Sequence, residues 1–91
     1  MRMEICARVF GRVQMVMFRD FSRRKAKTLG VRGQVKNMPD GSVEVVAQGE
    51  KNVLIEFIEE LRRGSIFSRV EKVDVLWREP SKEFNEFSII L

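Results

Sequence analysis

The stretch M-E-I-C-A-R-V-F-G at residues 3–11 sets the first element of the fold. Apolar and polar residues alternate along it, and this period of two is typical of a β-strand with one buried face. The strand is expected to end at Gly11. The elements that follow must cover its apolar face, so their order decides the architecture. The buried residues predicted for this strand are Met3, Ile5, Ala7 and Val9.

Two later segments have the period of an amphipathic helix. The first runs from Phe18 to Leu29 and is followed by Gly30, a residue that favours the left-handed C-terminal cap. The second follows Gln48-Gly49-Glu50 and closes at Arg62-Arg63-Gly64, where basic side chains suit the end of a helix. Its apolar face carries Val53, Leu54, Phe57, Ile58 and Leu61.

Period-two patterns predict four further strands, the first two of which are joined by the turn Met38-Pro39-Asp40-Gly41. The order is β-α-β-β-α-β with a short extra strand at the end. This order predicts an α+β, ferredoxin-like sandwich in which one antiparallel sheet carries both helices on one face. We expect residues 1–91 to form a single domain. The four strands cover residues 31–37, 43–47, 72–77 and 87–91.

Composition removes whole classes of chemistry. The 91 residues include no His and one Cys, Cys6, which excludes Ser-His triads, His-ligated zinc and an internal disulfide. We therefore expect no metal and no cofactor, so any catalysis must rest on Arg, Lys, Asn, Gln, carboxylates or backbone amides. The 17 Lys and Arg against 13 Asp and Glu give a net charge of +4, which attracts anions.

The apolar runs are far shorter than the roughly 20 residues that span a bilayer, so no membrane partner is expected. The start M-R-M-E has charges where a signal peptide has an apolar core. A lone Cys agrees with a reducing compartment. We expect a monomeric protein in the cytoplasm.

The segment G-R-V-Q-M-V-M-F-R at residues 11–19 joins the first strand to the first helix. Backbone amides at a helix N-terminus bind anions, and successive amides around one concavity form a nest for phosphate oxygens. Arg19, in the first helical turn, can hold the same anion with two N–H groups. A right-handed crossover makes the flanking strands parallel, so Asn37, at the end of the second strand, is expected beside this loop on the helix-covered face.

These residues resemble the two signature stretches of the acylphosphatases, G-R-V-Q-x-V-x-F-R at 11–19 and G-x-V-K-N-x-x-D-G-x-V-x-x-x-x-x-G at 33–49. The resemblance covers nearly the whole chain. It implies an enzyme that hydrolyses the carboxyl-phosphate bond of acyl phosphates to carboxylate and inorganic phosphate. It further implies catalytic roles for Arg19, as phosphate ligand, and Asn37, which orients the attacking water. The phosphate-binding residues that it implies are Gln14, Met15, Val16, Met17, Phe18 and Arg19.

Such a reaction needs no general acid, because the leaving carboxylate has a pKa of about 4 to 5. Positioning and charge neutralisation remain, and amides, Arg19 and Asn37 can supply both. The expected reaction is metal-independent and has no covalent enzyme intermediate. Gln14 is expected to lend its backbone N–H while its side chain does little. Backbone geometry explains four glycines: Gly11, Gly33, Gly41 and Gly49.

Met15 stands where the family usually has Gly. A positive φ at a residue other than Gly costs roughly 1 kcal/mol. Either the Met15 side chain points to solvent and the amide nest is intact, or it fills the site and the chain is an inactive domain that binds an anion or a partner. A further alternative is an RNA-binding module, but the strand beginning at Val43 has no aromatic residue for base stacking, so no nucleic acid is expected.

Overall fold

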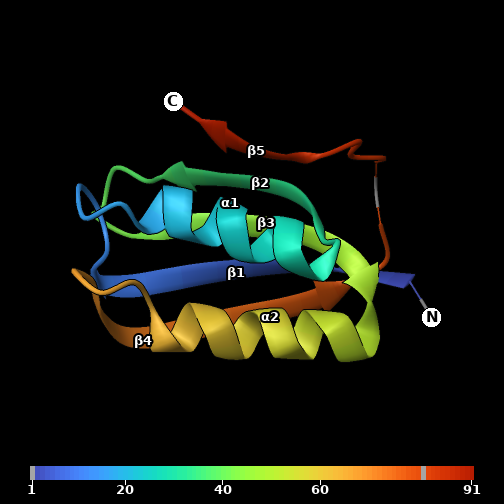
Figure 1. Cartoon of the computed structure of the whole chain (residues 1–91), viewed down its shortest axis with the longest axis horizontal. Helices are drawn as coiled ribbons and strands as arrows, with labels where there is room; N and C mark the ends of the chain where they lie inside the picture. Colours follow the sequence, from blue (N-terminus) through green and yellow to red (C-terminus); the bar gives the residue numbers. More distant parts are fainter. Residues whose placement is uncertain (1, 81) are drawn as a thin grey trace.

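A five-stranded sheet and two helices form in the order that the sequence patterns predict (Figure 1). The structure is a computed structural model and describes residues 2–80 and 82–91. The first helix spans the predicted residues, and the other elements begin or end within a few residues of prediction. The elements are β1 (Arg2–Arg12), α1 (Phe18–Leu29), β2 (Arg32–Asn37), β3 (Val43–Glu50), α2 (Lys51–Arg63), β4 (Arg69–Arg78) and β5 (Phe87–Ile90).

The sheet has the order β4-β1-β3-β2-β5. Strand β1 pairs antiparallel with β3 and β4, and β2 pairs antiparallel with β3, as predicted. The prediction of an entirely antiparallel sheet is wrong at β5, which pairs parallel with β2. The reason is the direction from which the chain returns. β4 finishes at the same end of the sheet at which β2 starts, so a strand that enters beside β2 from that end runs in the same direction as β2.

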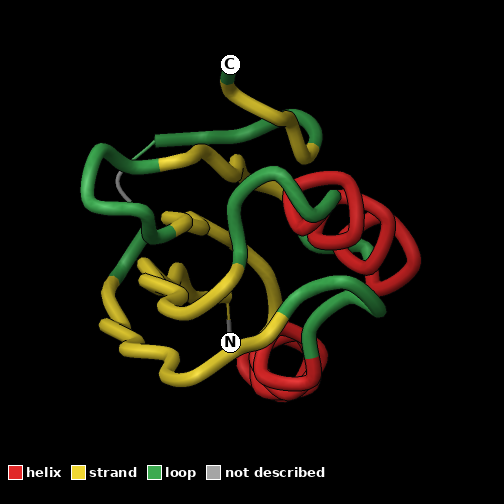
Figure 2. Tube along the Cα trace, turned by 90° about the vertical axis from the view of Figure 1, so that its left-hand side faces the viewer, coloured by secondary structure: helices red, strands yellow, loops and turns green. Residues whose placement is uncertain are grey.

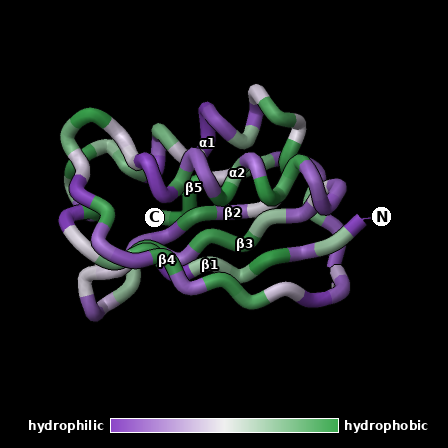
Figure 3. Tube along the Cα trace, turned by 90° about the horizontal axis from the view of Figure 1, so that it is seen from below, coloured by the Kyte–Doolittle hydropathy of each residue, from purple (hydrophilic) through white to green (hydrophobic). Residues whose placement is uncertain are grey.

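Both helices pack on the same face of this sheet, as predicted (Figure 2). Helix α1 packs on β2 and β5, and α2 packs on β1, β3 and β4. Hydrophobic and hydrophilic residues follow one another along the helices and strands, and the hydrophobic ones supply the core (Figure 3). β5 reaches the core through Phe87, whose ring meets Phe57 edge-on with 5.9 Å between centroids. The core includes Ile5, Ala7, Val9, Val35, Val45, Leu54, Phe57 and Leu61.

The other face of the sheet holds a buried polar cluster that the alternating pattern does not predict. Glu4 is 0% exposed although it lies on the polar side of β1, and its partner Gln48 contacts Lys82 and Phe84 of the segment before β5. Gln48 donates a hydrogen bond to Glu4 at 2.7 Å and another to the carbonyl of Lys82. Arg78 also donates to Glu4, and this bond raises the pKa of Arg78. The buried carboxylate is therefore stabilised by an ion pair and an amide.

Neither helix in the described part of the chain is long and apolar enough to cross a membrane.

Strand β1 changes its register with β4 between Phe10 and Gly11. Gly11 has φ +126, and a Cβ built there would lie 2.1 Å from the carbonyl oxygen of Arg69. Gly33 and Gly41 also have positive φ, which agrees with the backbone role predicted for them. Gly49 has neither a positive φ nor a close backbone approach, so that prediction is wrong for Gly49. Gly11 thus permits a close backbone approach where the chain leaves the sheet for the loop before α1.

This close approach makes Gly11→Ala a test of the fold. The added methyl group collides with backbone that cannot move aside cheaply, so the free energy of unfolding should fall by about 3 kcal/mol. The measurement is urea denaturation followed by circular dichroism. Gly49→Ala is the matched control, because a Cβ there meets nothing closer than 3.8 Å. Equal stabilities of the two variants would contradict the bulge geometry.

Candidate active site

The loop between β1 and α1 has the unusual backbone that an anion nest requires. Met15 has φ 60 and Met17 has φ 63, the two positive values among the described residues other than glycine. These two residues are 96% and 64% exposed, whereas Val16 between them and Val13 and Phe18 on either side are buried. The apolar residues anchor the loop in the core while both methionines point outward. Of the two alternatives left open by the sequence, the structure therefore has the Met15 side chain in solvent.

The backbone amides of this loop are free to bind a ligand. Within the described residues, no N–H group of residues 14–19 donates a hydrogen bond to another part of the protein. The first such bond of the helix runs from the amide of Phe21 to the carbonyl of Met17 at 3.0 Å. Unpaired donors at the N-terminus of a helix carry partial positive charge and favour an anion. We call residues 14–19 the cradle.

Arg19 follows these amides directly and retains an uncompensated charge. Its guanidinium donates to the carbonyl of Ile90 in β5 at 3.3 Å, and it has no carboxylate partner among the described residues. Two neighbouring arginines on α1 differ, because Arg23 and Arg24 pair with Asp20 at 3.6 and 3.0 Å. Arg19, together with Met15, Met17, Ile89 of β5 and Asp20, whose carboxylate pairs with Arg23 and Arg24, lines a surface pocket of about 240 Å³. Its cationic group can therefore meet an anion there.

Asn37 ends β2 and has an unsatisfied acceptor. Its Oδ1 atom is buried and has no hydrogen-bond partner in the described protein. Leaving a buried acceptor unpaired costs about 1–3 kcal/mol, and a bound water or ligand would remove that cost. The side chain is thus suited to hold a small hydrogen-bond donor.

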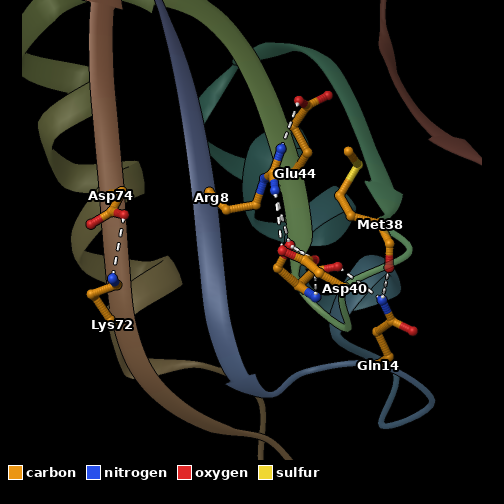
Figure 4. Close-up of polar contacts among 8 residues, drawn as sticks. Arg8, Gln14, Met38, Asp40, Glu44, Lys72 and Asp74 are labelled. Atoms are coloured by element: carbon orange, nitrogen blue, oxygen red, sulfur yellow. Dashed lines mark hydrogen bonds and ion pairs between the residues drawn. The ribbon is translucent and has the colours of Figure 1, made fainter.

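Gln14 connects the cradle to the turn that follows Asn37. Its Nε2 atom donates to the carbonyl of Met38 at 2.8 Å and to the carbonyl of Ser42 at 2.9 Å (Figure 4). The expectation that this side chain does little is therefore wrong. The amide satisfies two backbone acceptors of a turn, a long-range role that no local sequence pattern encodes.

The same turn is held from the opposite side by charged residues of the sheet. Asp40 accepts hydrogen bonds from the backbone and hydroxyl of Ser42, and these bonds lower the pKa of Asp40. Arg8 of β1 donates to the Ser42 hydroxyl at 3.3 Å and lies 3.5 Å from Asp40 and 3.7 Å from Glu44 (Figure 4). Asn37 consequently precedes a turn that is fixed on two sides.

A third segment, the loop 64–68 between α2 and β4, also reaches the cradle. The hydroxyl of Ser65 donates to the carbonyl of Val16 at 3.3 Å. Ile66 and Phe67 in this loop are 90% and 65% exposed. The sequence analysis missed these residues, and the exposed apolar pair directly after a helix stop is the signal that could have identified them.

Comparisons with known proteins agree on one family. The family model Acylphosphatase matches residues 5–89. A protein named Acylphosphatase from Methanococcoides burtonii is 42% identical, covering 92% of this chain and 90% of its own length. Another of that name, from Thermus thermophilus, is 48% identical over 82% of this chain and 85% of its own. The crystal structure of an acylphosphatase from Bacillus subtilis has a TM-score of 0.94 and 37% identity, covering 98% and 99% of the two chains.

The left-handed conformation of Met15 leads to a stability prediction. Met15→Gly removes the steric cost of a positive φ and loses little packing, so the free energy of unfolding should rise by about 0.5–1 kcal/mol. Met15→Ala retains the Cβ and should leave it unchanged. Urea denaturation compares the two, and calorimetric titration with inorganic phosphate should give similar affinities for both variants and the parent. A stabilised Ala variant, or a Gly variant that alone gains phosphate affinity, would contradict this description.

Proposed function

The chain belongs to the acylphosphatase family and hydrolyses acyl phosphates, and we propose the following roles for its residues in that reaction. The observation that carries the proposal is the coincidence of free amides in the cradle, an Arg19 without a carboxylate partner, and an unpaired oxygen on Asn37. Each is a costly arrangement for an isolated protein, and a bound phosphoryl group and water would satisfy all three.

The cradle and Arg19 bind the phosphoryl group. Amides at the N-terminus of α1 donate to its oxygens, and the guanidinium of Arg19 closes over it with two N–H groups. This exchange releases Arg19 from a single, long hydrogen bond to Ile90. Because the donors are fixed before substrate arrives, they can stabilise the charge that develops on the phosphoryl oxygens.

Asn37 holds the attacking water through its Oδ1 atom. The water attacks phosphorus as the bond from phosphorus to the acyl oxygen breaks, and the leaving carboxylate takes the electron pair. The balanced reaction is RCO–OPO₃²⁻ + H₂O → RCOO⁻ + HPO₄²⁻ + H⁺. The carboxylate is a good leaving group with a pKa of about 4 to 5, so the site needs no proton donor for it. The remaining rate acceleration comes from holding the water and the phosphoryl group in the geometry of attack.

The position of Met15 supports a working cradle over an inactive binding domain. The chain adopts a positive φ at this residue without glycine, and the side chain is fully outside the loop. The positive φ of Met15 lowers the stability of the fold and leaves the backbone amides of the cradle in place. A single-domain organisation, a monomeric state and a cytoplasmic location remain predictions from the sequence.

Two substitutions separate the proposed roles. Arg19→Ala should raise the inhibition constant of inorganic phosphate at least tenfold, since a charged phosphate ligand is lost. Asn37→Ala should lower kcat by about 100-fold and leave phosphate inhibition nearly unchanged, since it removes only the water ligand. Steady-state hydrolysis of acetyl phosphate with phosphate as competitor measures both.

Arg23→Ala, a paired arginine one turn further along α1, is the matched control and should behave like the parent. Activity should also survive a chelator. Loss of phosphate affinity in Asn37→Ala, or full activity in either of the first two variants, would refute the assignment.

The bridge from Gln14 to the turn gives a further prediction. Gln14→Leu retains the size of the side chain and removes both hydrogen bonds, so the turn after Asn37 loses its link to the cradle. We expect kcat to fall by about tenfold with little change in phosphate inhibition. In an Asn37→Ala background the same substitution should cause no further loss, because Gln14 acts through Asn37. Losses that multiply would instead indicate a general structural role.

A further inference from the structure

The loop 64–68 forms an apolar pocket beside the cradle. The pocket has a volume of about 330 Å³. Ile66 and Phe67 leave most of their surfaces in solvent, and so does Met17 of the cradle, which lines the same pocket. Exposed apolar side chains that gather around one hollow mark a binding surface more often than chance exposure does. The lining residues are Val16, Met17, Phe21, Arg24, Gly64, Ser65, Ile66 and Phe67.

The pocket lies on the side of the cradle opposite Asn37. Gln14 at one end of the cradle contacts the turn that follows Asn37, whereas Val16 contacts Ser65 of the loop 64–68. The strand order agrees, because β2 and β4 lie on opposite sides of β1, from which the cradle departs. Figure 1 shows the cradle between the end of β2 and the loop that precedes β4.

The direction of the reaction follows from this arrangement. In phosphoryl transfer, the attacking and leaving oxygens lie roughly in line across phosphorus. With the water on Asn37, the acyl group must leave the cradle on the far side, towards the loop 64–68. One bridging oxygen joins the phosphoryl and acyl groups, so the acyl group starts next to Met17. The other pocket at the cradle contains Arg19, Asp20 and Ile89 of β5, and the proposed role of Arg19 assigns it to the phosphoryl end.

The chemistry of the pocket favours an uncharged, apolar occupant. Its one cationic side chain, Arg24, is already paired with Asp20 at 3.0 Å. The remaining wall is mostly aliphatic, aromatic and backbone, so a second anionic group would find no free cation there. An alkyl or aryl group would instead remove exposed apolar surface from water.

We propose that the pocket formed by Met17, Ile66 and Phe67 is an acyl-binding subsite, and that it selects acyl phosphates with long aliphatic or aromatic acyl groups. This inference rests on the proposed function, since Asn37 and the cradle define the direction in which the acyl group leaves. The subsite binds the acyl group equally before and during the reaction, so it acts on KM and leaves kcat unchanged.

The test compares acetyl phosphate with hexanoyl phosphate, whose leaving carboxylates have nearly the same pKa. In the parent, KM should be at least tenfold lower for hexanoyl phosphate, with similar kcat. Removal of roughly 60 Å² of alkyl surface from water corresponds to about a tenfold change in affinity. The double substitution Ile66→Ser with Phe67→Ser should abolish this preference and leave the KM for acetyl phosphate and the inhibition constant of inorganic phosphate within about twofold.

Leu76→Ser is the matched control, because Leu76 is 60% exposed on β4, on the sheet face away from the helices, and should leave the preference intact. Equal KM values for the two substrates in the parent would overturn the subsite, whether or not the variant folds. A double variant that loses both substrates equally would also overturn it. If the parent hydrolyses neither substrate, the proposed function itself fails, and this inference fails with it.

Discussion

The two hydrogen bonds that Gln14 donates across the site determine how its parts are arranged. The cradle belongs to the connection between β1 and α1, and Asn37 belongs to the end of β2. Strand pairing brings the two strand ends near each other, because Val43 of β3 pairs with both Val9 and Asn37, but it does not fix the loop that follows β1. Gln14 fixes that loop against the turn after Asn37 by donating hydrogen bonds to the carbonyls of Met38 and Ser42. Arg8 of β1 holds Asp40 and Ser42 of the same turn from the other side of the sheet. The phosphate and water positions therefore share one rigid frame, which is the condition for catalysis by positioning.

Unfavourable features of the structure are concentrated at this frame. Met15 and Met17 have left-handed backbone, the amides of the cradle are unpaired, and Asn37 has a buried acceptor without a partner. Each costs on the order of 1 kcal/mol or more, and together they would remove a large part of the free energy of unfolding of a domain of this size. Val13, Val16 and Phe18 offset part of this cost by burying the apolar side of the same loop. Local strain and unpaired groups are thus confined to the part of the chain that meets the ligand.

Sequence patterns predicted the regular elements better than the contacts between them. The bounds of α1 follow from its apolar period and from Gly30, both of which are local signals. The cradle was predicted from residues 11–19, because the end of a strand, a turn and the start of a helix all have local sequence signals within these nine residues. The parallel pairing of β5, the side-chain role of Gln14, the burial of Glu4 and the contact of Ser65 with the cradle all join distant residues. Such contacts depend on how the elements are assembled, which periodicity does not report.

The strand order has a consequence for how the chain acquires this structure. Among the strands that the structure describes, only β2 and β3 are joined by a hairpin, and every other neighbouring pair in the order β4-β1-β3-β2-β5 brings together distant segments. β1 lies between β3 and β4, so a chain emerging from the ribosome cannot complete the pairing of its first strand until nearly all of it has been synthesised. Closing loops of that length costs chain entropy before the strand contacts that offset this cost can form. Folding is therefore slow relative to a helical protein of equal length. The apolar face of β1 is then the surface that a nascent chain exposes longest.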